Sequence, residues 1–316
     1  MLVAGIMVLA LNLRAAITSL PPVFTDLAAR LHLSPAEVTL LATIPVLCFG
    51  LFCVVAVPLS RRFGEERVLL GALALLAAGL ALRGALPGAL LYPGTVLAMA
   101  AIALMNVLLP SLVKRRQPGR AGQLIGAYLL CLALGAVFGS LLAVPLYRDT
   151  AHASWLGGPV RFTLWLWAIP AVIAFVVWLP QVRYRTVPGP VAPGAGARVP
   201  GARVPGARVP VARHPLAWQV TAFMGLQSLT YYAALSWLPT LFTDRGLSQA
   251  QAGDLSALMN LGNAVTCLLI PVIAHRMASQ QILAVPTVMA TAAGIAGVLY
   301  APLGGAWAWM LLLGLS

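Results

Sequence analysis

Long apolar segments separated by short polar stretches run along almost the whole of this chain. Their length matches the roughly 20 apolar residues that a helix needs to cross the hydrocarbon core of a bilayer. We expect membrane spans near residues 2–26, 37–59, 68–88, 91–113, 121–146, 161–180, 216–242, 250–274 and 282–303, with a tenth beginning near Ala306. The first span is long, has no basic leader and carries an arginine centrally, so we do not expect a cleaved signal peptide.

The composition supports this interpretation. Hydrophobic residues make up 61% of the 316 residues and charged residues 9%, and the mean hydropathy is +0.93. These values exclude a soluble globular protein and predict an all-α integral membrane protein embedded in a lipid bilayer. The net charge of +13 does not indicate a nucleic-acid partner, because no basic domain with interleaved aromatic residues stands apart from the spans.

Basic residues are distributed unevenly between the two ends of the predicted spans. The larger set follows spans two, four, six and eight: Arg61, Arg62, Arg67, Lys114, Arg115, Arg116, Arg120, Arg183, Arg185, Arg198, Arg203, Arg208, Arg213 and Arg276. The smaller set lies near the opposite ends: Arg30, Arg83, Arg148, Arg161 and Arg245. By the positive-inside rule we expect a multi-pass protein of the cell (inner or plasma) membrane with a cytoplasmic N-terminus. Arg83, near the outer end of span three, is expected to extend to the lipid headgroups.

A repeated pentapeptide separates two groups of spans. Gly-Ala-Arg-Val-Pro occurs three times between residues 196 and 210, and proline and glycine at this density cannot bury a core. We interpret 183–215 as a flexible basic cytoplasmic linker between an N-terminal bundle of six helices, 1–182, and an incomplete C-terminal bundle, 216–316.

Two short patterns recur on either side of this linker. Pro-Pro-Val-Phe-Thr-Asp at 21–26 matches Pro-Thr-Leu-Phe-Thr-Asp at 239–244, and Leu-Ser-Pro-Ala-Glu at 33–37 matches Leu-Ser-Gln-Ala-Gln at 247–251. In the second pair Ser34 and Ser248 are expected to be N-caps of capping boxes. Spans one and two therefore correspond to spans seven and eight in the same orientation. A parallel duplication around a long loop is the plan of major facilitator transporters.

The chain also resembles one branch of that superfamily. The motifs are Asn12-Leu13-Arg14 and Ile17-Thr18-Ser19 in span one, Asn106-Val107-Leu108-Leu109-Pro110 and Val113-Lys114-Arg115 in span four, and Gln227-Ser228, Tyr231-Tyr232 and Trp237-Leu238-Pro239 in span seven. Their order and placement resemble the cyanate and 2-nitroimidazole (CynX/NimT) transporters. The resemblance implies a major facilitator fold of two pseudo-symmetric six-helix bundles, here truncated in the tenth helix. The superfamily signature at 60–67 is degenerate, since its arginine and glycine are present and its aspartate is not.

Arg14 is the first indication of chemistry. It lies in an otherwise charge-free apolar run, where a cation costs about 2.5 to 3.5 kcal/mol unless it faces a protein interior or a watery cavity. The acidic residues lie in loops or at span ends, so its partner is expected to be the cargo. A guanidinium suits a small planar or linear anion.

Other polar residues inside the spans complete the candidate substrate-binding set. Thr18 shares a helical face with Arg14. In the superfamily that the chain resembles, spans one, four, seven and their neighbours line the substrate path. The full set is Arg14, Thr18, Asn106, Tyr128, Gln227, Tyr231, Asn260 and Asn263. The alternative for each amide and hydroxyl is a hydrogen bond between neighbouring helices. The glycine pairs Gly122 with Gly126 and Gly135 with Gly139 are expected to let span five approach a partner closely.

These features favour a secondary active or facilitative transporter of a small anionic or polar organic solute that acts by alternating access. We expect it to be a monomer, with no cofactor and no metal. The alternative is a truncated non-transporting remnant or sensor of transporter ancestry. An enzyme is disfavoured, because His32, His152, His214 and His275 are scattered in loops. Cys48, Cys53, Cys131 and Cys267 lack metal-type spacing and are interpreted as packing residues. Proton symport, exchange, uniport and efflux all remain open.

Overall fold

The computed structural model describes residues 2–85, 88–149, 159–184, 186, 215–276, 281–300 and 302–315. The secondary structure of these residues is helical, as predicted. The first part comprises α1 (Leu2–Thr18), η1 (Pro21–Val23), α2 (Phe24–Leu31), α3 (Pro35–Phe63), α4 (Glu65–Ala85), α5 (Leu91–Arg116), η2 (Pro118–Arg120), α6 (Ala121–Asp149), α7 (Pro159–Leu166), α8 (Ala168–Trp178) and η5 (Leu179–Arg183). The second comprises α9 (Pro215–Asp244), α10 (Gln249–Arg276), α11 (Gln281–Tyr300), η7 (Leu303–Gly305) and α12 (Ala306–Leu315). Of the predicted linker 183–215, residue 185 and residues 187–214, with the pentapeptide repeats, lie outside the described residues.

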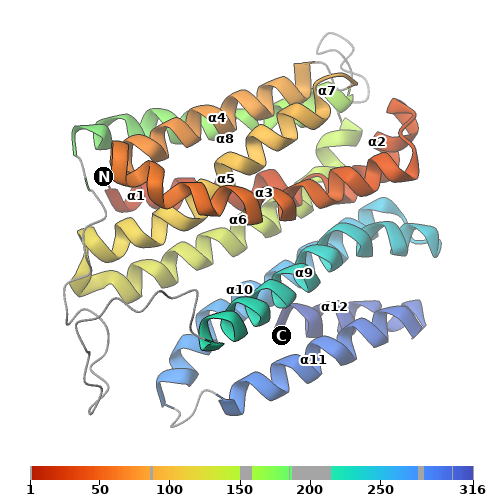
Figure 1. Ribbon diagram of the computed structural model, residues 1–316. Coiled ribbons are helices and arrows are strands. Elements are labelled where there is room, and N and C mark those ends of the chain that lie inside the picture. The colour runs from red at the N-terminus through yellow and green to blue at the C-terminus, as the bar shows by residue number, and fades with distance from the viewer. Residues whose placement is uncertain are drawn as a thin grey trace.

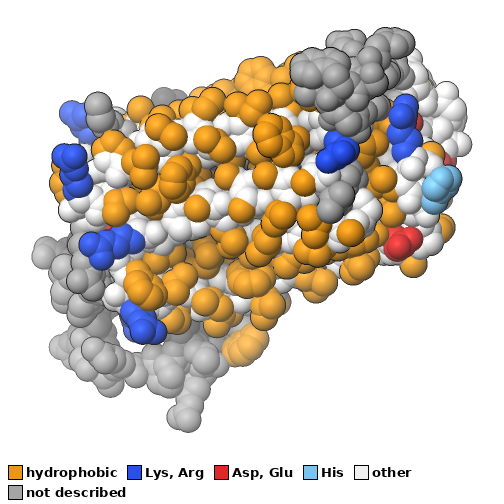
Figure 2. Space-filling view, turned by 90° about the horizontal axis from the view of Figure 1, so that it is seen from above, with side chains coloured by type: hydrophobic (Ala, Val, Ile, Leu, Met, Phe, Trp, Pro, Cys, Tyr) orange, Lys and Arg blue, Asp and Glu red, His pale blue; other side chains and the backbone are white. Residues whose placement is uncertain are grey.

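Six helical segments within the described residues are long and apolar enough to cross a membrane. They are Val3–Leu31, Pro35–Phe63, Glu65–Ala85, Leu91–Arg116, Pro118–Tyr147 and Val160–Arg183. Figure 2 shows one consequence: apolar side chains cover the middle of the visible face, and charged side chains gather at its two ends. We call the end that carries the N-terminus and the α3–α4 turn the basic end, and the opposite end the η1 end.

Two predicted spans are interrupted. The segment predicted as one helix over 2–26 leaves the α-helical form after Thr18, passes through the 3-10 turn η1 and resumes as α2. Pro21 and Pro22 cause the break, because proline has no N–H to donate to the preceding turn. The sixth span is divided into α7 and α8 at Trp167. The first predicted span, 2–26, nonetheless lies within one apolar segment that is long enough to cross a membrane, Val3–Leu31.

The helices form two groups that lie side by side (Figure 1). One group contains the helices from α1 to α8, and the other contains α9 to α12. They meet through α6 and α10, and through η1, which contacts α6, α9 and α10. At the η1 end Phe24 and Phe242 are both buried, whereas Trp218, Phe223 and Leu226 in the first half of α9 are exposed. The two groups are thus closed against each other at the η1 end.

The duplicated turns adopt the same local structure. Ser34 and Ser248 are N-caps, and each accepts the amide N–H three residues later, at 3.4 and 3.3 Å. Glu37 and Gln251 reach back to the serine amides at 2.7 and 3.0 Å. The residue two positions before each serine, His32 in one copy and Gly246 in the other, has a positive φ that ends the preceding helix. The capping-box prediction is confirmed in both copies.

One of the two predicted glycine faces makes a close helix contact. A Cβ on Gly139 would lie 2.8 Å from the Ala15 carbonyl oxygen and against the Thr18 hydroxyl, and a Cβ on Gly135 would meet the Leu11 carbonyl. These glycines therefore let α6 press against α1. Within the described part of the chain, no atom lies within 4 Å of the position that a Cβ on Gly122 or Gly126 would take, so the prediction that they pack closely was wrong.

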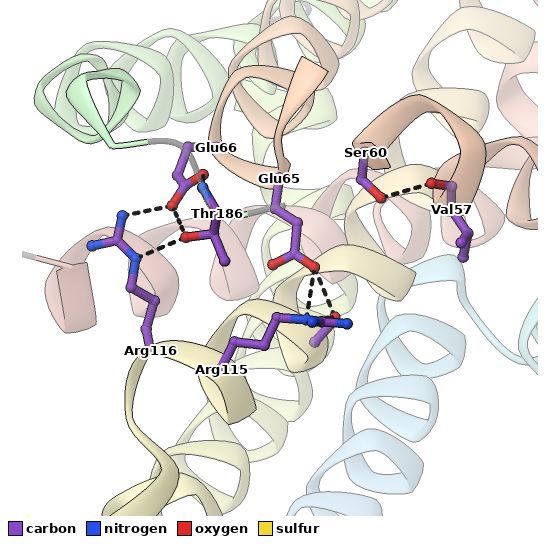
Figure 3. Close-up of polar contacts among 8 residues, drawn as sticks. Val57, Ser60, Glu65, Glu66, Arg115, Arg116 and Thr186 are labelled. Atoms are coloured by element: carbon purple, nitrogen blue, oxygen red, sulfur yellow. Dashed lines mark hydrogen bonds and ion pairs between the residues drawn. The ribbon is translucent and has the colours of Figure 1, made fainter. Parts of the chain in front are cut away.

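A network of ion pairs holds the basic end of the first group (Figure 3). Glu65 and Glu66, both fully buried, begin α4 and face the end of α5. Arg115 Nε lies 3.3 Å from Glu65 Oε1, and Arg116 Nη2 lies 2.6 Å from Glu66 Oε1. The amide of Thr186 donates to Glu66 Oε2 at 2.7 Å, which also fixes the chain just after η5. In this chain, two glutamates supply the acidic groups at the degenerate signature.

Replacing Gly139 tests the α1–α6 contact. Gly139→Ala is expected to lower the free energy of unfolding by about 1 to 3 kcal/mol, because the methyl group has no room against α1. The matched control is Gly126→Ala on the same helix, which should be neutral or stabilising because alanine favours a helix over glycine by roughly 1 kcal/mol. Melting temperatures in detergent compare the two, and equal shifts would contradict the proposed contact.

Replacing Glu66 tests the network. Glu66→Gln is expected to cost about 2 to 3 kcal/mol of stability, because it leaves the Arg116 guanidinium partly buried without its carboxylate. Glu37→Gln is the control, since glutamine already completes the capping box at the equivalent position 251. The measurement is the melting temperature of each variant. A loss at Glu37 as large as that at Glu66 would count against the network.

Candidate functional site

Arg14 lies where the two groups of helices meet. Its guanidinium carbon is 4.9 Å from the centre of the Tyr231 ring and 5.7 Å from the centre of the Tyr232 ring. Both rings come from α9, in the second group. Cation–π contacts of this kind contribute up to about 2 kcal/mol each when water is excluded. Arg14 Nη1 is buried and has no hydrogen-bond partner among the described residues, so the rings hold the cation without satisfying it.

A chain of hydrogen bonds positions one of these rings. Tyr231 Oη donates to Asn260 Oδ1 at 2.9 Å. Asn260 is almost completely buried and donates in turn to Ser140 Oγ at 3.2 Å and to the Ser256 carbonyl at 2.9 Å. Ser140 belongs to α6, so this chain joins the second group of helices to the first. These three hydrogen bonds occupy the Asn260 side chain, so Asn260 affects Arg14 indirectly, by holding the Tyr231 ring in place.

Asn106 and Tyr128 form a second polar pair. Tyr128 Oη lies 3.4 Å from Asn106 Oδ1, which joins α6 to α5. The Tyr128 phenol lies within electrostatic range of the Arg14 guanidinium. This pair therefore adds a hydroxyl and an amide to the surroundings of Arg14.

Thr18 does not belong to the polar side chains around Arg14. Its side chain is fully buried, and its hydroxyl lies 3.0 Å from the carbonyl oxygens of both Arg14 and Ala136. It shares one turn of α1 with Arg14, as its spacing predicts, but its hydroxyl is used within the α1–α6 contact.

Gln227 and Asn263 line a separate cavity. A pocket of about 510 Å³ lies among α9, α10, α11 and α12. Tyr231 belongs to its wall and also faces Arg14. Gln227 is exposed, and Asn263 accepts a weak hydrogen bond from Cys267 Sγ at 3.8 Å. The structure thus divides the predicted set into a group around Arg14 and a group in this pocket, with Tyr231 common to both.

Arg83 departs from its predicted position. It was expected to extend to the lipid headgroups, yet only 1% of its surface is exposed. Its three guanidinium nitrogens have no hydrogen-bond partner among the described residues. The side chain points inward from α4 and lines a small cavity with residues of α1 and α9.

Sequence reasoning did not select Tyr232 or Ser140 for the site. Tyr232 is next to Tyr231, but neighbouring residues on a helix normally point to different faces. Here both rings lie against Arg14, and they meet each other edge to face with their centroids 5.3 Å apart. Ser140 gave no separate signal, since it lies among the small residues of span five. The described residues contain no group of three or more His, Cys, Asp or Glu side chains arranged to hold a metal ion.

Comparison with known proteins agrees with this architecture. The family model of the Major Facilitator Superfamily matches residues 2–316. The 2-nitroimidazole transporter of Escherichia coli (strain K12) is 38% identical over 99% of this chain and 75% of its own length. An uncharacterized transporter of Bacillus subtilis (strain 168), YycB, is 31% identical over 100% of this chain and 74% of its own length. The cyanate transport protein CynX of E. coli is 27% identical over 98% of this chain and 76% of its own length.

Solved structures share the fold at low sequence identity. A bacterial homologue of the human lysosomal transporter Spinster, in an inward-facing conformation, superposes with a TM-score of 0.71 at 15% identity and covers 99% of this chain and 71% of its own. A D-xylose–proton symporter gives 0.63 at 18% identity over 99% of this chain and 78% of its own. The chain belongs to the Major Facilitator Superfamily, within the branch that contains the 2-nitroimidazole and cyanate transporters.

Proposed function

We propose that this protein moves a small anionic or polar organic solute, of the cyanate class, across the cell membrane by alternating access. The observation that carries the proposal is the Arg14 guanidinium, which is held between the two groups of helices by aromatic rings and has a buried nitrogen without a partner. Membership of a transporter superfamily supports transport in general. The names of two relatives, a 2-nitroimidazole transporter and a cyanate transport protein, support a small planar or linear cargo.

The charge balance around Arg14 favours an anion. Among the described residues, ion pairs within 4.0 Å join Glu65 to Arg115 and Glu66 to Arg116, and both lie at the basic end. A cation in the middle of the membrane costs about 2.5 to 3.5 kcal/mol on the insertion scale. Two ring faces offset part of this cost but accept no directed hydrogen bond. An anion supplies both the opposite charge and the acceptor.

The residues around Arg14 have distinct roles in this proposal. The guanidinium presents two parallel N–H donors, which suit a carboxylate-like or linear anion better than an ammonium does. Tyr231 and Tyr232 shield the pair from water, and Asn260 fixes the Tyr231 ring. Tyr128 and Asn106 offer a further donor and acceptor from the first group. Because α1 and α9 belong to different groups, an anion bound to Arg14 is held at the interface that alternating access opens and closes.

Substitution of Arg14 tests the binding role. Arg14→Gln is expected to abolish uptake of radiolabelled cyanate into proteoliposomes, because the charge is lost. Arg14→Lys is expected to reduce uptake by about tenfold or more, because an ammonium keeps the charge but lacks the planar pair of donors. Parallel assays with nitrate and 2-nitroimidazole compare anions of different shape with a relative's named substrate.

The control for this experiment is Arg120→Gln, which removes an exposed cation at the basic end and should leave uptake unchanged. Full transport by Arg14→Lys would contradict bidentate recognition. Full transport by Arg14→Gln would contradict an anion site at this residue altogether. All variants are compared at equal protein content and ionic strength, because screening by salt changes any weak electrostatic effect.

Labelling of an introduced cysteine, in a protein whose four native cysteines are replaced by alanine, tests the proposed orientation, in which the basic end is cytoplasmic. Arg120→Cys, at the basic end, is expected to react with a membrane-impermeant maleimide only in inverted membrane vesicles. Arg30→Cys, in α2 at the η1 end, is expected to react from outside intact cells. The reverse pattern would show that the η1 end faces the cytoplasm.

A further inference from the structure

Arg83 is a second buried cation, and it has no partner among the residues that the structure describes. Its side chain is 1% exposed, and Nε, Nη1 and Nη2 all lack hydrogen-bond partners within the described part of the chain. Removing a charged group from water without pairing it is costly. A fully buried guanidinium with three free nitrogens therefore indicates a missing acceptor.

The neighbouring helices hold this side chain inside the protein. A Cβ on Gly94 would lie 2.7 Å from the Arg83 amide nitrogen, and a Cβ on Gly79 would lie 2.6 Å from the Ala98 amide nitrogen. These two glycines let α5 lie directly against α4, and at the opposite edge of α4 Gly84 packs on Trp165. Close packing on both sides of α4 prevents Arg83 from reaching lipid.

Arg83 is also not needed to satisfy the end of its own helix. Basic residues near a helix C-terminus often donate to the last carbonyl groups. Here Arg161 takes that role, because its guanidinium donates to the carbonyl oxygens of Gly84 and Ala85. A capping function therefore does not account for Arg83.

Arg83 faces a cavity that both groups of helices line. The cavity walls include Ile17 of α1, Leu20 directly before η1, Thr95 of α5, and Tyr232 and Ser236 of α9. Its volume is about 20 Å³, which is room for roughly one water molecule. The cavity is thus small in this conformation, in which the η1 end is closed.

Tyr232 connects this cavity to Arg14. It lines the cavity with Arg83, and its ring also lies 5.7 Å from the Arg14 guanidinium carbon. Along α1, Ile17 follows Arg14 by about one turn toward η1, a rise of about 4.5 Å at 1.5 Å per residue, and Leu20 lies beyond the end of α1, directly before η1. The two guanidinium groups are therefore arranged in series along the axis between the two ends, with the Tyr232 ring between them.

We infer that Arg83, with Tyr232 and Ser236, forms a second anion-binding subsite on the η1 side of Arg14. This inference rests on the proposed function and extends it. When the η1 end opens, Arg83 binds the anion first, and the anion then passes Tyr232 to reach Arg14. The subsite takes the same small planar or linear anions, since its recognition group is again a guanidinium, with the Ser236 hydroxyl as an additional donor.

A side-selective transport assay tests the subsite. Uptake of radiolabelled cyanate is measured in right-side-out vesicles, with the η1 end outside, and in inverted vesicles, with the basic end outside. Arg83→Gln is expected to raise the apparent KM about tenfold or more in the first preparation, because entry from the η1 end begins at this residue. In inverted vesicles the KM should stay within about twofold, since the anion reaches Arg14 first.

Three further variants complete the test. Arg83→Lys should give an intermediate rise, because the charge remains and the planar donors are lost. Thr95→Leu keeps the guanidinium but fills the cavity, so it should reproduce the side-selective rise even if Arg83→Gln fails to fold. The matched control is Arg30→Gln, which removes an exposed cation from the same end and should leave both KM values unchanged.

The outcomes separate this inference from the proposed function. An equal change in both preparations, or no change in either, for Arg83→Gln and Thr95→Leu would overturn the second subsite. If Arg14→Gln at the same time abolishes uptake from both sides, the proposed function stands without it. If Arg14→Gln transports normally, the proposed function itself fails. A stability measurement adds a separate readout: Arg83→Gln should melt at a higher temperature than the wild type in anion-free buffer, because a buried unpaired charge is removed.

Discussion

The structure depends on how a positively charged side chain, Arg14, is accommodated between the two groups of helices. The Arg14 guanidinium is held by two tyrosine rings from the other group of helices rather than by a carboxylate. An internal acid at this position would form a permanent ion pair and compete with any anion for the cation. The rings lower the cost of burial and leave the donors available. This arrangement requires that α1 and α9 face each other. Arg14, the proposed binding residue, is therefore itself part of the interface between the two groups of helices.

The contacts that support this interface come from small residues and fixed hydrogen bonds. Gly135 and Gly139 bring α6 against α1, and Ser140, one residue further along, receives the Asn260 amide from α10. The same helix therefore supports Arg14 from behind and connects to the residue that positions Tyr231. In a membrane, where the hydrophobic effect does not drive helices together, close backbone approach and polar contacts of this kind determine which helices pair.

The two fully buried glutamates, Glu65 and Glu66, lie away from this region. Glu65 and Glu66 are buried at the basic end, where Arg115 pairs with Glu65, and Arg116 and Thr186 bind Glu66. The separation matters because a carboxylate near Arg14 or Arg83 would neutralise it. The α3–α4 turn, whose sequence departs from the superfamily signature, retains an acidic–basic network with glutamate in place of aspartate.

The sequence by itself determined the helices, the duplicated turns and the presence of a cation in a span, because these depend on composition and on patterns within a few residues. Hydropathy gave the spans, and the capping boxes at Ser34 and Ser248 needed only neighbours three residues away. Tertiary structure alone decided which side chains meet. From the sequence pattern, Arg83 is a residue near a span end and Gly126 is equivalent to Gly139. In the structure Arg83 is buried, and Gly139, unlike Gly126, has a close partner among the described residues. Whether a position faces lipid, another helix or a cavity depends on helices far away in the sequence, and periodicity fixes the face of a helix but not what lies opposite to it.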